Sequence, residues 1–477
     1  MIEMTLKLFN TWSKKKEIFK PIKPGKVGYY SCGPTVYSSS HLGHAVTYIR
    51  TDMLKQFLKK WKGFAVKHVQ NITDFGHMTS DADEGIDKIK KAMERERKTA
   101  EEITKFYTED FHRAMKKLKV EPPDVEPKAS ENVDAMIETI KKIIENGYAY
   151  VKDGTVYFDV SKYKDYGKLS GKNMKEQEEQ QRVKDPNKKN PNDFVLWAKH
   201  KPGHSHVWNS PWGKGMPGWH IECSAMSRKY LGGDFDIHSG GVDHYFPHHE
   251  NEIAQNYGAF GTIGANYWVH FGLLSINGEK MSKSKGNFIT IDAALKKFSP
   301  EEIRMWTFSS HYKSTLDYSE GKLRKAKEKL DKINKFIQRL LEIAEPSERI
   351  ESDIAKKYHK KFEAAMDDDL NTPQALAVLF DLITEVNKKI ENRSLTKKEA
   401  ADILSLLKKI DSVFKIMNFE KEIVKIPEEV KKLIEEREKA RAEKNWEKAD
   451  EIRDKIREMG YLLEDSEQGV RCKKIKQ

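Results

Sequence analysis

The sequence contains very little cysteine and lacks any long apolar stretch. Its 477 residues include three cysteines, Cys32, Cys223 and Cys472. So few cysteines cannot form the disulfide framework of a small secreted domain, so these thiols are free, metal-bound or catalytic. No run of ~18 apolar residues is present, and the first residues lack the apolar core of a secretory signal. We therefore expect a cytoplasmic protein without membrane association.

The composition also excludes a disordered chain. Hydrophobic residues make up 38% of the sequence, charged residues 34% and aromatic residues 10%. This aromatic content is too high for an intrinsically disordered protein. Lysine and arginine number 86 against 74 acidic residues, which leaves a net charge of +12. This basic excess favours a polyanionic partner such as nucleic acid, although a lysine-rich solvated surface explains it equally well.

The N-terminal part alternates strand and helix patterns. Residues 27–31 and 64–72 are predicted to form strands, and residues 44–60 between them show apolar residues at helical spacing. A strand, a helix and a strand at this spacing form a βαβ unit. The predicted fold class is therefore α/β, with a parallel sheet that is covered by helices.

The pattern then changes over residues 122–217. A helical segment at 133–146 and a β-like segment at 149–160 are followed by a very polar stretch at 172–192. Burial of this stretch would be costly, so we interpret it as an exposed loop within an insertion.

The α/β pattern resumes at Gly218. We expect strands at 235–238 and 267–275 and a helix at 246–258. After Pro300 the chain is predicted to be almost wholly helical as far as Met459.

The helical region is predicted to end in a helical hairpin. Its two helices are expected at 427–443 and 445–459. Asn445 is suited to cap the second helix, and Gly460 is suited to end it in the left-handed conformation.

Two histidines stand where the first helix is expected to begin, in Ser38-Ser-Ser-His41-Leu-Gly-His44. Serines there can cap the helix, and the free backbone N–H groups at its start attract anions. His41 and His44 could donate to phosphate oxygens, while Gly43 would let a nucleotide approach the backbone closely. Taken alone, the motif is explained as well by a capped helix with two surface histidines.

A lysine-rich loop follows much later, as Lys280-Met-Ser-Lys283-Ser-Lys285. Lysine places a point charge on a flexible stem, so such a loop can close over nucleotide phosphates and stabilise charge that develops on them. A charged, solvated turn is the alternative. The presence of the histidine motif in the same chain favours a nucleotide site.

A third set of residues has metal-ligating chemistry. His248 and Glu252 are four residues apart, which places them on one face of a helix. Cys32 and Cys223 add two thiols, and thiolate, imidazole and carboxylate are ligands suited to zinc. The spacing alone only suggests a metal site, because the cysteines are far apart in sequence. His248 and Glu252 could equally be ordinary polar residues on the exposed face of a helix.

The histidine and lysine motifs resemble the HIGH and KMSKS signatures of class I aminoacyl-tRNA synthetases, with Leu42 in place of the usual Ile. Five motifs, in order and across most of the chain, resemble the cysteinyl-tRNA synthetase family. They are SCGPTVY with HLGH, GWHIECSAM, FDIHSGG, PHHENEIAQ and KMSKSKGN.

The resemblance implies a site for each substrate. The metal ligands of the single Zn²⁺ are expected to be Cys32, Cys223, His248 and Glu252. ATP, which is used with Mg²⁺, is expected to contact His41, Gly43, His44, Lys280 and Lys283. Thr73, Trp219 and His238 are expected in the amino-acid pocket, although each could simply be a packed residue at a strand end. The other histidines of these motifs, His220, His244 and His249, are expected at the surface or behind the ligands.

The implied activity is that of a cysteine–tRNA ligase, with L-cysteine, ATP and tRNA(Cys) as partners and a monomer as the expected state. Zinc binds a substrate thiolate far better than a hydroxyl, so it would distinguish cysteine from serine without an editing site. One alternative is a ligase that couples activated cysteine to a small amine. Another is an RNA-binding relative that has lost catalysis.

The same resemblance implies a Rossmann-type catalytic domain with an inserted connective domain, then a helical bundle and a small anticodon-binding domain. The expected boundaries are 1–120 and 218–276 for the two catalytic halves, 121–217 for the insertion, 277–330 for the lysine-loop and stem-contact region, 331–420 for the bundle and 421–477 for the anticodon-binding segment. Two departures from the family stand out, namely Cys472 in place of a common Trp and a longer segment at 75–85.

Overall fold

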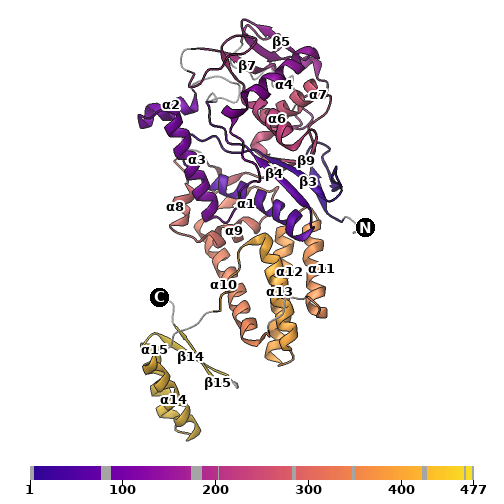
Figure 1. Cartoon of the computed structure of the whole chain (residues 1–477). Helices are drawn as coiled ribbons and strands as arrows, with labels where there is room; N and C mark the ends of the chain where they lie inside the picture. The colour runs from indigo at the N-terminus through magenta and orange to yellow at the C-terminus, as the bar shows by residue number, and fades with distance from the viewer. Residues whose placement is uncertain are drawn as a thin grey trace. The chain divides into compact units, whose positions relative to one another are not determined.

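The computed structural model describes residues 5–76, 87–172, 185–201, 204–281, 286–345, 350–421, 427–466 and 469–474. They form two compact units, Met1–Met417 and Asn418–Gln477 (Figure 1). No helix within these ranges is both long enough and apolar enough to cross a membrane.

The first unit is built around a four-stranded parallel sheet. Its strands are β3 (Lys26–Ser31), β4 (Ala65–Gln70), β9 (Phe235–Gly241) and β10 (Ala265–Phe271). They are ordered β10-β9-β3-β4, and every neighbouring pair is parallel. The predicted βαβ unit and parallel sheet are therefore confirmed. Every residue of β9 is buried, as expected when helices cover both faces of a sheet.

Helix α1 (Leu42–Gln56) connects β3 to β4, and a π-helical segment, Phe57–Trp61, continues it. The capping residue is His41, so the prediction of a serine cap is wrong. His41 has an extended backbone, and its ring Nδ1 accepts from the backbone N–H of His44 at 3.3 Å. The backbone carbonyl of Ser40 instead accepts from the N–H of Ile291 at 3.0 Å. The chain before the helix is thus paired with a distant segment.

Two further helices and an N-terminal β-hairpin also belong to the first unit. The elements are α2 (Lys88–Glu96), α3 (Ala100–Lys117), β1 (Lys7–Asn10) and β2 (Lys15–Ile18). Of the longer segment at 75–85, positions 77–85 lie outside the described residues.

The insertion contains helix α4 (Val133–Glu145) and an antiparallel sheet. The sheet is ordered β5 (Ala149–Lys152), β6 (Thr155–Phe158), β7 (Phe194–Lys199), β8 (Gly215–Pro217). Its apolar residues share one core with the parallel sheet, since Phe158 and Trp197 belong to the same buried cluster as Tyr30 on β3. Of the predicted exposed loop, 173–184 lies outside the described residues.

Helix α7 (Glu250–Phe260) begins four residues later than predicted. Phe246 precedes a proline and has an extended backbone with φ −142° and ψ 132°, which is incompatible with a helix. Residues 245–249 therefore form a separate turn. Helix α6 (Trp219–Leu231) lies beside α7 in Figure 1 and packs against it.

The region after Pro300 is mostly, but not wholly, helical. Its helices are α9 (Pro300–Phe308), α10 (Glu320–Ile343), α11 (Asp353–Asp367), α12 (Thr372–Glu391) and α13 (Lys397–Phe414), after the short α8 (Ile291–Leu295). Strand β13 (Leu316–Tyr318) interrupts them and pairs in parallel with β11 (Leu274–Ile276), which also pairs with β12 (Glu279–Lys280). The pairing is non-local, which explains why helical periodicity alone did not reveal it.

A buried ion cluster joins α1 to the helices of the C-terminal half of this unit. Asp52 on α1 accepts from Arg304 on α9 at 2.9 Å and from Lys415, just after α13, at 2.9 Å. The side chains of Asp52 and Arg304 are both completely buried. Arg304 also donates to the carbonyl of Phe414 at 2.7 Å. A hydrogen-bonded charge network therefore joins α1 to α9 and to the end of α13.

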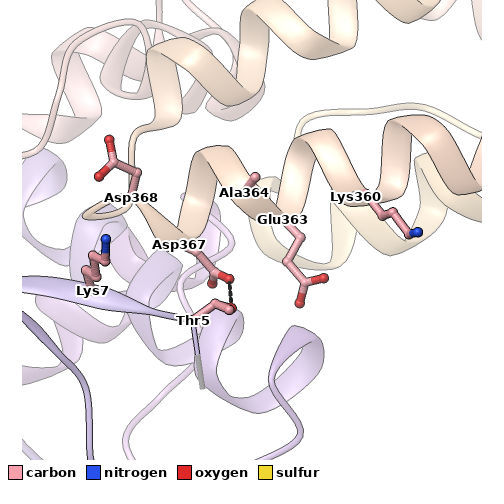
Figure 2. A pocket seen from close by; sticks show the side chains of 7 residues that line it. All are labelled: Thr5, Lys7, Lys360, Glu363, Ala364, Asp367 and Asp368. Carbon is pink, nitrogen blue, oxygen red and sulfur yellow. Dashed lines mark hydrogen bonds between the residues drawn. The ribbon is translucent and has the colours of Figure 1, made fainter. Parts of the chain in front are cut away.

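A pocket of about 340 Å³ lies where the N-terminal strand meets α11 (Figure 2). Its lining residues are Thr5, Lys7, Lys360, Glu363, Ala364, Asp367 and Asp368. The carboxylates in it are already engaged. Asp367 pairs with Lys62 at 2.7 Å and accepts from Thr5, while Asp368 pairs with Lys16 at 2.6 Å. We therefore interpret this pocket as a junction between two parts of the fold and not as a ligand site.

The second unit confirms the predicted helical hairpin. It consists of α14 (Glu428–Ala442), α15 (Trp446–Glu458) and the antiparallel strands β14 (Tyr461–Ser466) and β15 (Gly469–Lys474). The Asn445 side chain caps α15, and Gly460 ends it at φ 85°. The strands were not predicted. Cys472 lies on β15 opposite Leu463, whose side chain belongs to the small core of this unit.

Candidate metal and nucleotide site

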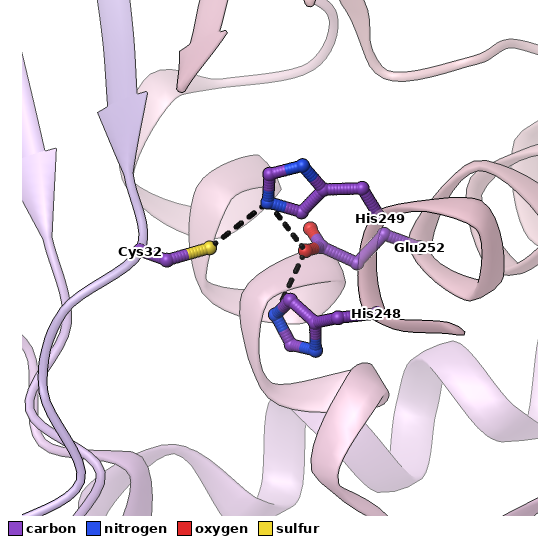
Figure 3. Close-up of side chains that lie close together, drawn as sticks. All are labelled: Cys32, His248, His249 and Glu252. Carbon is purple, nitrogen blue, oxygen red and sulfur yellow. Dashed lines mark hydrogen bonds and ion pairs between the residues drawn. The ribbon is translucent and has the colours of Figure 1, made fainter. Parts of the chain in front are cut away.

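Four buried side chains from two segments converge beyond the carboxyl end of β3. They are Cys32, which directly follows the strand, and His248, His249 and Glu252, at the start of α7 (Figure 3). One ligand atom from each lies within 4.8 Å of all the others. A strand end and a helix start thus place a thiol, two imidazoles and a carboxylate around one point.

Glu252 pairs with two histidines, one inside this cluster and one on the neighbouring strand β9. Its two carboxylate oxygens lie 3.0 Å from Nε2 of His248 and 2.9 Å from Nε2 of His238 on β9. The first pair spans one helical turn, as the spacing predicts. His249 Nε2 lies 3.2 Å from Sγ of Cys32, and its Nδ1 lies 2.7 Å from Nε2 of His270.

The local charges favour an ionised carboxylate in this buried place. Burial raises the pKa of Glu252, but the nearby His238 and His248 outweigh it and lower this pKa to about 2. Burial lowers the pKa of His248, whereas the charge of Glu252 and a hydrogen bond with Cys223 raise it to about 10. Because His248 carries a proton where a metal would bind, ligation would displace that proton.

Cys223 lies on α6, beside this cluster. Its thiol is buried, donates to Oδ1 of Asn71 at 3.8 Å, and lies close enough to Cys32 and His248 for both to affect its pKa. The hydrogen bond with Cys32 lowers the pKa of Cys223 to about 7, against the effect of burial, whereas burial raises the pKa of Cys32. A thiol with a pKa near neutrality readily gives the thiolate that binds metals.

The structure groups three of the four predicted metal ligands, Cys32, His248 and Glu252, with His249 in place of Cys223. Cys223 lies beside two members of this group, Cys32 and His248. His249 and His220 are both buried, so neither lies at the surface. The spacing of His249, three residues before Glu252 on the same helix start, is the signal that would have revealed it. Two thiols, imidazole and carboxylate form a donor set that fits zinc.

Two of the three predicted pocket residues, His238 and Trp219, contact this cluster, and the third, Thr73, contacts helix α6. His238 bonds to Glu252, and the ring of Trp219 stacks on that of His248 with centroids 4.5 Å apart. Thr73 donates to the carboxylate of Glu222 on α6 at 2.7 Å.

Asn71, which sequence reasoning missed, ties the cysteine loop to this pocket. Its Oδ1 accepts from the backbone N–H of Gly33 at 2.9 Å, and its Nδ2 donates to Thr73 at 3.1 Å. A Cβ at Gly33 would lie 1.4 Å from the carbonyl oxygen of Asn71, so only glycine fits there. Asn71 directly follows β4 at the carboxyl edge of the sheet, where ligands bind in parallel α/β folds, and this position could have indicated a functional role.

The histidine motif lies against the segments that flank the lysine motif. The rings of His41 and His44 stack with centroids 3.7 Å apart. The N–H of Leu42 donates to the carbonyl of Ile289 at 2.9 Å, and Met281 lies 3.4 Å from the position of a Cβ at Gly43. Two motifs more than two hundred residues apart therefore meet at the start of α1.

The lysines themselves are only partly described. Lys280 is the last residue of β12, where its backbone pairs with Ser275. Lys283 lies outside the described residues. The hydroxyl of Tyr48 on α1 donates to the carbonyl of Cys32 at 3.3 Å, which links the helix with the histidine motif to the Cys/His/Glu cluster.

Comparison with solved structures shows the fold. The chain is similar to a Mycobacterium tuberculosis methionyl-tRNA synthetase in complex with methionyl-adenylate, with a TM-score of 0.59, 16% identity, and coverage of 82% of this chain and 90% of that one. It is also similar to an Agrobacterium radiobacter LeuRS in a ternary complex with tRNA and LeuAMS, with a TM-score of 0.60, 11% identity, and coverage of 83% and 85%. The fold is that of class I aminoacyl-tRNA synthetases.

Sequence comparison is more specific. Residues 18–328 match the tRNA synthetases class I (C) catalytic domain, residues 361–418 the DALR domain, and residues 424–471 the cysteinyl-tRNA ligase anticodon binding domain.

Full-length relatives agree with these matches. The cysteine–tRNA ligase of Pyrococcus horikoshii is 43% identical over 99% of this chain and 100% of its own length. That of Chlorobaculum tepidum is 40% identical over 99% of both chains. The chain therefore belongs to the cysteinyl-tRNA synthetases, the cysteine–tRNA ligases of class I.

Proposed function

We propose that this enzyme selects cysteine through a zinc ion and charges tRNA(Cys) in two steps. In the first, the cysteine carboxylate attacks the α-phosphorus of ATP, the bond to the β-phosphate oxygen breaks, and pyrophosphate leaves. In the second, the cysteinyl group moves from the adenylate to the terminal ribose of the tRNA, and AMP leaves. The observation that carries this proposal is the meeting of the histidine motif, the flanks of the lysine motif and the Cys/His/Glu cluster at one edge of the sheet.

The nucleotide is assigned to the start of α1. His41 and His44 would donate to phosphate oxygens, and Gly43 would allow the ribose and phosphates to approach the backbone. Lys280 and Lys283 would stabilise the charge that develops on the leaving pyrophosphate, and Mg²⁺ would accompany ATP. Because the cysteine carboxylate is already a nucleophile, this step needs positioning and charge stabilisation but no general base.

The amino acid is assigned to the metal cluster. Cys32, Cys223, His248 and Glu252 would hold the zinc, which when bound offers a coordination position that a substrate thiolate fills much better than a hydroxyl. His238 holds Glu252 in its ionised form. Trp219, stacked on His248, would form a wall of the pocket, and Thr73 would line it from the end of β4.

The tRNA is assigned to the helical part and the second unit. We assign residues 331–420 to the bundle, in which 361–418 match the DALR domain, and residues 421–477 to anticodon recognition. The catalytic halves 1–120 and 218–276, the insertion 121–217 and the connecting region 277–330 complete this proposed division. Cys472 removes one aromatic surface on which a base could stack.

The match over residues 424–471 also separates this proposal from its alternatives. A ligase for a small amine has no anticodon to read, and a purely RNA-binding relative would not need both phosphate motifs. Retention of both features favours the tRNA ligase.

Cysteine-dependent ATP–pyrophosphate exchange tests the proposal. The zinc-loaded protein is expected to exchange with cysteine, to reject serine by on the order of 10⁴-fold in kcat/KM, and to lose exchange after zinc removal with recovery on readdition. Aminoacylation of tRNA(Cys) transcript is measured in parallel. Exchange without aminoacylation would favour the small-amine ligase, and no exchange with any amino acid would favour the RNA-binding relative.

A further inference from the structure

A single carboxylate holds the hairpin from which the lysine motif begins. Strands β11 and β12 are joined by Asn277 and Gly278, both of which have positive φ, at 50° and 80°. This is the two-residue turn that Asn-Gly sequences favour in hairpins. The second strand ends at Lys280, so the hairpin fixes where the lysine motif starts.

Asp317, on the neighbouring strand β13, contacts this hairpin twice. Its Oδ1 accepts from the backbone N–H of Gly278 at 2.7 Å and from the hydroxyl of Ser275 at 2.7 Å. Ser275 is the residue opposite Lys280 in the β11–β12 register. The carboxylate therefore touches both the turn of the hairpin and the partner of the first motif lysine.

The other oxygen of the same carboxylate reaches the start of helix α10. Oδ2 accepts from Nζ of Lys322 at 2.7 Å, and Lys322 lies in the first turn of the long helix α10. These three hydrogen bonds, led by the one from Lys322, lower the pKa of Asp317 to about 2. A carboxyl with this pKa is ionised at neutral pH, and its bonds are of the strong charge-assisted kind.

From these contacts we propose that Asp317 is a positioning residue for ATP activation. It would fix the β11–β12 hairpin against the start of α10, so that Lys280 begins the lysine motif at the correct place relative to His41 and His44. This inference rests on the proposed function, because it assigns the nucleotide to these motifs. Asp317 itself touches no substrate, and its effect would act through the hairpin.

The test compares Asp317→Ala, Asp317→Asn and a matched control in zinc-loaded, full-length enzyme. Misplacement of a phosphate-binding group by about 1 Å can cost on the order of 10²-fold, so Asp317→Ala is expected to lower kcat/KM for ATP in pyrophosphate exchange by 10- to 100-fold. The KM for cysteine and the zinc content are expected to stay unchanged. Asp317→Asn keeps an acceptor for Gly278 and Ser275 but loses the charge facing Lys322, so an intermediate loss is expected.

The control is Glu320→Gln, which removes a carboxylate from the same helix start. Glu320 pairs with Lys297 at 2.7 Å and with Arg324, not with the hairpin, so wild-type kinetics are expected. Wild-type ATP kinetics in Asp317→Ala would overturn the inference. An equal loss for ATP and cysteine together with lost zinc in Asp317→Ala would overturn it as well. An absence of cysteine-dependent exchange in the wild-type enzyme would instead refute the proposed function.

Discussion

Replacement of Cys223 by serine is expected to reduce kcat/KM for cysteine activation by on the order of 10³-fold. Loss of a residue that hydrogen-bonds to a metal ligand costs about 10- to 100-fold, and loss of the ligand itself is expected to cost more. Serine is almost isosteric but does not ionise near neutral pH, so it cannot replace the thiolate. Discrimination against serine as a substrate should fall together with zinc content. ATP binding should change much less. Pyrophosphate exchange with each amino acid, together with zinc analysis, measures these effects.

Two further variants make this result interpretable. Cys472→Ser changes the cysteine of the second unit and should leave zinc content and exchange unchanged. His249→Asn tests the other possible fourth ligand, since His249 belongs to the tightest group around Cys32. If His249→Asn loses zinc while Cys223→Ser retains it, the assignment of Cys223 is wrong.

Replacement of Asp52 by alanine is expected to destabilise the first unit by about 3–5 kcal/mol. The substitution would leave Arg304 completely buried without its carboxylate, and Lys415 would lose the same partner. Removing one member of a buried ion pair costs far more than the pair contributes, because the remaining charge is left without compensation. Denaturant unfolding at a fixed zinc concentration, followed by helical circular dichroism, provides the measurement.

A surface pair is the matched comparison for this variant. Glu345 pairs with Lys397 at 2.9 Å, and both side chains are two-thirds exposed. Glu345→Ala should therefore change the free energy of unfolding by less than about 1 kcal/mol. If Asp52→Ala proves as mild as Glu345→Ala, the network does not hold α1 against the bundle as described.

The sequence predicted the parts of the fold that depend on local pattern. The βαβ unit, the parallel sheet and the terminal helical hairpin follow from hydrophobic periodicity and from caps such as Asn445, which are properties of short segments. Strand β13 was missed because its three residues are specified by pairing with β11, forty residues earlier. The start of α7 was misplaced because a proline three residues before the helix forces extended backbone at Phe246.

In the candidate site, too, the sequence predicted what depends on local motifs and missed what depends on distant neighbours. Motif order was enough to name Cys32, Cys223, His248 and Glu252, and the structure groups three of them with His249 and places Cys223 beside that group. Sequence reasoning overlooked His249, although its spacing from Glu252 was a local signal. It could not reveal the roles of Asn71 and Asp317, which depend on neighbours that are distant in sequence. The serine cap at the first helix was wrong for the same reason, since Ser40 is occupied by pairing with Ile291.

X-ray absorption at the zinc edge tests the central claim most directly, because it counts the sulfur atoms around the metal. With Cys32 and Cys223 as ligands, the zinc-loaded enzyme should show two sulfur neighbours, and addition of L-cysteine should raise this number to three. Serine should leave the spectrum unchanged. A sulfur count that does not rise with cysteine, in enzyme that still carries out cysteine-dependent exchange, would contradict selection of the substrate by its thiol at this metal.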